Sequence, residues 1–287
     1  MRIDAHQHFW RIADRAGQWP PAECTALHRD FAPDDLLPFL AEAGIDGTVL
    51  IQSLPSEADT AFLLGLAARM PVVKAVVGWT DLKAPTAPIA IARLARDPKL
   101  RGLRPMLQDI ADAAWIVDPA LAPAVAAMVG HDLVFDALVQ PRHLTHLLTF
   151  AERHPDLRIV IDHGAKPAIG ERGMDAAWRR AMAALAARPN VACKLSGLLS
   201  EAGGRAEAAR PYAEALVVLF GPDRLIWGSD WPVLNQAGSY RRWLDLCRAI
   251  VPPAQHEAVF GGNAVAVYRL DASASVDEGA TRCAAWA

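Results

Sequence analysis

The chain lacks several features that would place it in other protein classes. It has no run of about 20 apolar residues, the length a membrane-spanning helix needs. No cluster of lysine and arginine is present and the net charge is -3, which argues against a nucleic-acid partner. The first residues show no basic and apolar leader pattern. We therefore expect a cytoplasmic protein that binds neither a membrane nor a nucleic acid.

The sequence also lacks closely spaced cysteines and a glycine-rich phosphate-binding loop. The four cysteines are scattered without a CxxC pair, which predicts reduced thiols with structural roles. No glycine-rich loop follows the first apolar run, as it would in an open doubly wound sheet that binds a dinucleotide. That fold remains the alternative to the one predicted next.

What the chain does contain is a repeated alternation of short apolar runs and longer segments with helical spacing. Eight such repeats predict a single (β/α)8 TIM barrel over residues 1–270. The predicted strands are residues 2–6, 48–52, 72–77, 103–105, 133–138, 158–162, 191–195 and 225–227. The predicted helices are residues 34–43, 57–70, 86–96, 119–129, 141–154, 174–188, 208–220 and 240–250.

Three glycines and two irregular segments complete this division. Gly44, Gly130 and Gly221 each follow a helical segment, where a left-handed residue commonly ends a helix. Residues 9–33 form a long connection after the first strand, and we expect it to lie over the mouth of the barrel. Residues 271–287 are predicted to be a flexible C-terminal tail that the fold does not need.

The first predicted strand carries a pair of histidines. If side chains alternate strictly along it, Asp4, His6 and His8 point to one side and Ile3, Ala5 and Gln7 to the other. Two imidazoles would then converge on one point, where they could hold a metal ion or polarise a carbonyl group.

Polar side chains gather at the end of every predicted strand, which is where active sites of TIM barrels lie. Each has a structural interpretation as well: Asp162 could cap backbone amides, and Gln140 could cap the next helix. The joint occurrence at one end favours a functional site. The residues concerned include His6, His8, Gln52, Trp79, Arg104, Gln140, His163, Lys194 and Asp230.

Four segments resemble one known family. Residues 4–10 (DAHQHFW), 161–167 (IDHGAKP), 194–198 (KLSGL) and 228–233 (GSDWPV) look like motifs of the amidohydrolase-related TIM-barrel hydrolases. More narrowly, they resemble the branch of sugar and dicarboxylate lactonases that includes L-fuconolactonase and 2-pyrone-4,6-dicarboxylate lactonase. The resemblance covers residues 2 to about 270.

The resemblance implies hydrolysis of a ring ester with His6, His8, His163 and Asp230 as catalytic residues. Asp230 would act as the general base on water, and the histidines would polarise the carbonyl group. Members of the wider family bind divalent metals, but here Arg104 stands where a binuclear site would have a bridging lysine or glutamate. We therefore favour metal-free catalysis. The alternative is one divalent ion, such as zinc, bound by the same four residues.

A single strand-end arginine argues against a dicarboxylate, so we expect a sugar lactone, an aldono-1,4- or 1,5-lactone. Residues 194–201 and 228–233 resemble the fuconolactonase side of the branch most, which implies a substrate similar to L-fuconolactone. Two alternatives remain open: a metal-dependent amidase or decarboxylase, and a noncatalytic sugar-binding barrel. The sequence predicts no oligomeric state. The predicted substrate-binding residues are Trp10, Gln52, Trp79, Arg104, Gln140, Lys194 and Trp231.

Overall fold

Eight parallel strands form the centre of the molecule. The computed structural model describes residues 1–170 and 173–270, so the predicted tail, residues 271–287, lies outside the described residues. The strands are hydrogen-bonded in sequence order, each parallel to the next. They are β1 (Ile3–Gln7), β2 (Gly47–Ile51), β3 (Val73–Gly78), β4 (Leu100–Leu103), β5 (Val134–Ala137), β6 (Ile159–Ile161), β7 (Val191–Leu195) and β8 (Leu225–Trp227).

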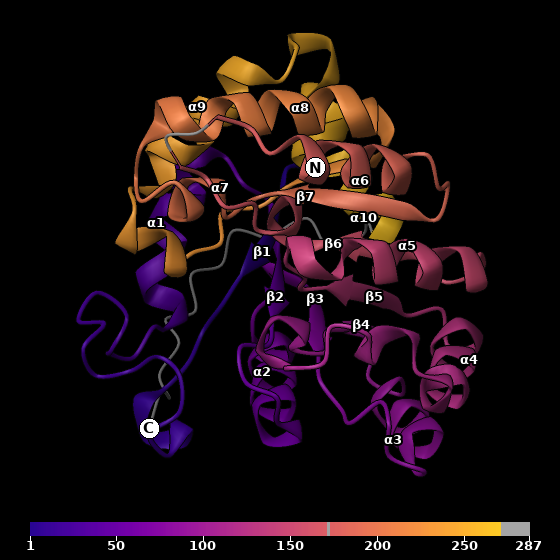
Figure 1. Ribbon diagram of the computed structural model, residues 1–287. Coiled ribbons are helices and arrows are strands. Elements are labelled where there is room, and N and C mark those ends of the chain that lie inside the picture. Colours follow the sequence, from indigo (N-terminus) through magenta and orange to yellow (C-terminus); the bar gives the residue numbers. More distant parts are fainter. Residues whose placement is uncertain (171–172, 271–287) are drawn as a thin grey trace.

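Helices follow the strands and surround them (Figure 1). All but the last of them, α10 (Asn263–Tyr268), bury apolar side chains against the outside of the sheet, as expected for a parallel barrel. This arrangement confirms the predicted (β/α)8 fold. The helices are α1 (Pro33–Ala43), α2 (Glu57–Arg69), α3 (Ala87–Leu94), α4 (Ala122–Gly130), α5 (Leu144–Arg153), α6 (Ala176–Ala186), α7 (Leu198–Glu201), α8 (Ala206–Arg224), α9 (Tyr240–Ile250) and α10 (Asn263–Tyr268).

The barrel closes between β8 and β1. The Asp230 amide donates to the His6 carbonyl at 2.8 Å, and the His8 amide donates to the Trp231 carbonyl at 2.8 Å. Because these bonds run through the residues that follow β8, closure of the barrel brings Asp230 beside the histidine pair.

The apolar core has two layers. One lies between the strands and the surrounding helices, and the other fills the barrel interior with alternate strand residues such as Val49, Ile51 and Val77. Tyr268 and Ala264 of α10 belong to the interior layer. The sequence analysis did not predict α10, which packs against the interior of the barrel rather than its outer ring.

Two local predictions differ from the structure. The fourth strand ends at Leu103, so Arg104 and Pro105 follow it; proline lacks the N–H that a ladder position would donate. Gly44 ends α1 with a left-handed φ of 64° as predicted, but Gly130 is the last residue of α4, and the left-handed position falls at Asp132 with a φ of 62°. In the described part of the chain, no helix is long and apolar enough to span a membrane.

Candidate active site

A cavity of about 500 Å³ opens at the carboxyl ends of the strands. Four of the residues singled out from the sequence line it: His8, Arg104, His163 and Asp230. The polar residues that the sequence analysis did not name are Gln18, Ser53, Gln108, Asp109, Lys166, Ser200, Glu201 and Gln236.

The histidine pair reaches this site through an irregular stretch of β1. The β1–β2 register shifts between Asp4 and Gln7, so strict alternation of side chains, which the sequence analysis assumed, does not hold. Asp4 does not lie with the histidines: its carboxylate accepts bonds from the Ser229 amide at 2.8 Å and the Tyr240 hydroxyl at 3.0 Å. Asp4 thus ties β1 to β8 and α9 and has a structural role.

Two glycines make room for the imidazoles. A Cβ on Gly228 would lie 2.7 Å from the Cβ of His6, and one on Gly197 would lie 2.7 Å from the His163 ring. Gly197 also has a left-handed φ of 66°, which a side chain would strain. His163 and Asp230 themselves have left-handed φ values of 53° and 60°. Such strain at residues other than glycine is concentrated at functional sites.

Three imidazoles surround one oxygen of Asp230. The Nε2 atoms of His8, His6 and His163 lie 3.4, 3.7 and 3.8 Å from Asp230 Oδ1. Burial alone would raise the pKa of Asp230, but the three histidines outweigh it and hold that pKa below its ordinary value. Asp230 is therefore a carboxylate at neutral pH.

The imidazole nitrogens that face away from Asp230 are held by hydrogen bonds. His8 Nδ1 lies 2.8 Å from the Ile51 carbonyl oxygen; because that oxygen only accepts, Nδ1 carries a proton. His163 Nδ1 lies 2.8 Å from the Ser196 hydroxyl. Burial lowers the pKa of His163 to about 4 and that of His6 well below its usual value.

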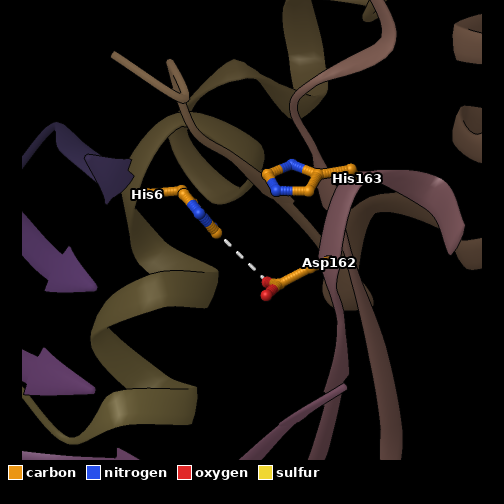
Figure 2. A group of neighbouring side chains, drawn as sticks. All are labelled: His6, Asp162 and His163. Atoms are coloured by element: carbon orange, nitrogen blue, oxygen red, sulfur yellow. Dashed lines mark ion pairs between the residues drawn. The ribbon is translucent and has the colours of Figure 1, made fainter. Parts of the chain in front are cut away.

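Beneath the imidazoles lies a buried network of charges. Figure 2 shows His6 and His163 beside Asp162, whose Oδ1 is 3.4 Å from His6 Nδ1. Asp162 also pairs with Lys194 at 3.0 Å and with Arg104 at 3.2 Å. Burial would raise the pKa of Asp162, and the two cations and His6 hold it well below its ordinary value. Asp162, first considered as a backbone cap, is a carboxylate that orients His6 and Arg104.

Lys194 lies in this network and not on the cavity wall. Its side chain is fully buried, and Nζ lies 2.5 Å from Asp136 Oδ2 and 3.2 Å from His6 Nδ1. Asp136 in turn accepts a bond from the Tyr268 hydroxyl at 2.9 Å. The chain of contacts places Lys194 behind His6, where it supports the imidazole and does not reach a ligand in the cavity.

Arg104 is the one predicted substrate-binding residue that lines the cavity. Gln52, fully buried, donates to the Arg104 carbonyl at 2.7 Å, and Arg104 donates back to the Gln52 carbonyl. Gln52 therefore positions the arginine. The sequence analysis placed both residues at strand ends. In the structure, Arg104 lines the cavity and Gln52 lies behind it as a support.

Four other predicted binding residues lie elsewhere. Trp10 donates from its indole to the Arg29 carbonyl at 2.8 Å, and Trp231 packs edge-on against Phe31 with ring centroids 5.3 Å apart. Trp79 is held through its backbone by Thr60, and Gln140 accepts from Arg142 at 3.1 Å. None of the four lines the cavity.

Several wall residues could have been found in the segments already singled out. Trp19 lines the cavity and belongs to the long connection predicted to cover the mouth. Lys166 follows His163 in the second motif, and Glu201 comes three residues after the third. Gln108 and Gln236 carry no comparable signal, because an isolated glutamine in a loop has no characteristic spacing.

Two groups of side chains have the composition and spacing of a metal site: His6 with His8 and Asp230, and His6 with Asp162 and His163. Asp162 of the second group is already paired with two cations. In the first group, His8 carries a proton on Nδ1, so its Nε2 would face the Asp230 carboxylate oxygen with a lone pair if the imidazole carried no second proton. Two acceptor atoms repel each other. The contact becomes favourable if Nε2 is also protonated or if a metal ion lies between the two atoms.

The donor distances agree with the second possibility. Zinc bonds of 2.0–2.1 Å at tetrahedral angles separate ligand atoms by about 3.3–3.4 Å. The His8 and His6 nitrogens lie 3.4 and 3.7 Å from Asp230 Oδ1. Two imidazoles and a carboxylate are also ligands that zinc accepts. The residues of the first group therefore fit one divalent ion.

Comparison with known proteins places the chain in a family. Residues 3–270 match the amidohydrolase family. The chain belongs to this family. It is 56% identical over 280 residues to an L-fucono-1,5-lactonase of Burkholderia ambifaria, a match that covers 94% of this chain and 96% of that protein.

Two further amidohydrolase relatives come from Burkholderia multivorans. An L-fucono-1,5-lactonase is 40% identical over 94% of this chain and 96% of its own length. The crystal structure of an amidohydrolase with bound zinc is 39% identical, covers 94% of this chain and all of that one, and superimposes with a TM-score of 0.88. Given the fitting donor set and a zinc-bound relative, the preference for metal-free catalysis finds no support.

Proposed function

We propose that this amidohydrolase opens the ring of a sugar lactone, an aldono-1,5-lactone such as L-fucono-1,5-lactone, to give the aldonic acid. The observation that carries the chemistry is the ionised Asp230 at the cavity wall, with three imidazoles on one of its oxygens. The choice of substrate is supported by the two similar L-fucono-1,5-lactonases.

The first step is attack of water on the lactone carbonyl carbon. His6, His8 and His163 all contact Oδ1 of Asp230, so we assign Oδ2 as the oxygen that accepts the proton of the attacking water. The Arg104 guanidinium, held by Asp162 at 3.2 Å, supplies a permanent positive charge for the developing oxyanion. Asp230 then returns the proton to the departing ring oxygen.

A divalent ion belongs to the proposal as well. His6, His8 and Asp230 would hold it, with His163 beside them. When bound, such an ion polarises the carbonyl group and lowers the pKa of water. Metal analysis of the purified protein should find about one equivalent of a divalent ion such as zinc, and chelation should lower both the metal content and the melting temperature. Protein that contains no metal and melts unchanged after chelation contradicts this part of the proposal.

The cavity walls suit a hydroxylated, uncharged ring. Gln18, Gln108, Gln236 and Ser53 offer amide and hydroxyl groups, and Trp19 offers an indole face. The predicted substrate-binding residues also included amide and indole side chains, but none of these five wall residues was among them. Glu201 and Asp109, also on the wall, disfavour a dicarboxylate ligand.

Proton release from a panel of aldono-1,4- and 1,5-lactones tests the proposal, since ring opening liberates an acid. We expect the highest rate with L-fucono-1,5-lactone. An amidase or decarboxylase would leave the lactones intact and act on amides or aromatic acids. A sugar-binding barrel would bind lactone with no acid release, and either result overturns the proposed reaction.

A further inference from the structure

Three polar side chains on the cavity wall take no part in the chemistry described above. Lys166 Nζ lies 2.9 Å from Gln108 Oε1 and 3.5 Å from Glu201 Oε1. The three residues come from segments that follow β6, β4 and β7. Tertiary structure alone brings them together, and all three line the cavity that contains Asp230.

The backbone around Lys166 has an unusual conformation. Residues 163–166 are all left-handed, with φ values of 53°, 56°, 64° and 48°. Three of them are not glycine, and each such residue costs on the order of 1–2 kcal/mol. The tight turn directs His163 to Asp230 and Lys166 to the wall of the same cavity. One strained segment thus supplies both a residue of the catalytic centre and a charged wall residue.

The pair is only partly shielded from solvent. The Lys166 and Glu201 side chains are each 26% exposed, so both have atoms open to the cavity. An ammonium group has three donors and a carboxylate has about four acceptor sites. The Lys166 contacts with Gln108 and Glu201 therefore leave donor and acceptor capacity for a ligand.

Their combined chemistry matches a polyol better than an anion. Neighbouring hydroxyls can each accept from an ammonium group and donate to a carboxylate. A ligand carboxylate would gain from Lys166 but would be repelled by Glu201. Because the two side-chain charges cancel, the wall offers directional hydrogen bonds without a net attraction for acids.

We propose that Lys166 and Glu201, aligned by Gln108, bind the ring hydroxyls of the lactone and set the preference of this enzyme for hydroxylated over plain lactones. This inference rests on the proposed function. It assigns specificity to a pair of residues separate from the Asp230 centre.

The test compares L-fucono-1,5-lactone with δ-hexalactone, which has the same ring size and ring methyl group and no hydroxyls. The ratio of the two kcat/KM values measures hydroxyl recognition. In Lys166→Met and Glu201→Gln, we expect this ratio to fall about 10- to 100-fold, the loss typical of a hydrogen bond to a charged group. The fall should appear mainly in KM, and Lys166→Arg should restore part of it.

A matched control comes from a second lysine–carboxylate pair away from the cavity. Lys83 Nζ lies 2.6 Å from Asp118 Oδ2, and the Lys83 side chain is 25% exposed. Lys83→Met should leave the selectivity ratio unchanged. Melting temperatures of all variants show whether each one folds.

The outcomes separate this inference from the proposed function. Equal losses on both lactones, or no loss on either, overturn the assignment of hydroxyl recognition to the pair. If the wild-type protein opens neither lactone, the proposed function fails instead. Calorimetric binding of L-fucono-1,5-lactone then tests the pair by itself, and an unchanged Kd in Lys166→Met overturns it.

Discussion

At the scale of single residues, the site depends on charged groups whose neighbours fix their state. Asp230 stays ionised because three imidazoles outweigh the effect of burial. His8 has a fixed tautomer because its Nδ1 meets a carbonyl oxygen that can only accept. Each of these states follows from one or two contacts, so single substitutions can test them.

We predict that Asp230→Asn lowers kcat by about 100- to 10,000-fold, the usual contribution of a general base. The amide is close in shape to the carboxylate, so the protein should remain folded. Steady-state kinetics measure the loss, and circular dichroism with metal analysis separates a missing base from a missing ligand. Near-native turnover in this variant would exclude the assigned role.

Lys194 provides a second test at this scale. Lys194→Met leaves Asp136 and Asp162 facing one another without the cation between them. Breaking a buried pair on one side costs about 3 to 5 kcal/mol, and we expect that loss in the free energy of unfolding measured with urea. As a control, Arg93→Ala removes an exposed pair with Glu57 and should cost less than about 1 kcal/mol. Similar costs for the two variants would show that the buried network does not stabilise the barrel.

At the scale of elements, the connection between β1 and α1 covers one side of the cavity. Its short helical turn, Ile12–Arg15, ends in a buried arginine. Arg15 donates to the Trp19 carbonyl at 2.9 Å and to the Ser53 hydroxyl at 2.7 Å. Trp19, 38% exposed, forms part of the cavity wall. The arginine therefore fastens this connection to the segment that follows β2.

We predict that Arg15→Met loosens the connection without unfolding the barrel. Hydrogen exchange of residues 9–33 should increase, and KM for the lactone should rise several-fold because Trp19 is no longer held at the wall. Asp14→Ala, which removes an exposed pair with Arg11, is the matched control and should change neither. Unchanged exchange in Arg15→Met would contradict the fastening role.

At the scale of the whole molecule, α10 completes the interior of the barrel. Its Tyr268 is buried, and its hydroxyl donates to Asp136, which binds Lys194 behind His6. Helix α10 is thus linked to the candidate active site through Tyr268, Asp136, Lys194 and His6. The described chain ends two residues later, at Leu270.

Two truncations test where the folding unit ends. A chain that stops after Leu270 should retain its melting temperature and activity, since the predicted domain covers residues 1–270. A chain that stops after Gly262 loses α10 and its buried apolar side chains, and we expect it to unfold or aggregate. Thermal melting of both truncated chains measures the two effects. A large fall in the melting temperature of the chain that stops after Leu270 would show that residues 271–287 belong to the domain.

The barrel and the centre of the candidate site could be predicted from patterns in the amino-acid sequence. Eight alternating segments specify a parallel barrel, because a parallel sheet must bury both faces and needs a helix after each strand. That fold places strand ends together, so the sequence predicts that His6, His8, His163 and Asp230 lie in one place. A position on or just after a strand is not sufficient, because Gln52, Trp79 and Lys194 have such positions and do not line the cavity.

The direction and burial of the other side chains depend on packing between distant parts of the chain, which no sequence pattern predicts. A register shift in β1 separates Asp4 from the histidines, and burial turns Lys194 from an expected substrate contact into a support for His6. The walls come from connecting segments, where Trp19, Lys166 and Glu201 meet across large sequence separations. Periodicity determines which face of a regular element a residue occupies, but the path of a loop follows from packing among distant parts of the chain.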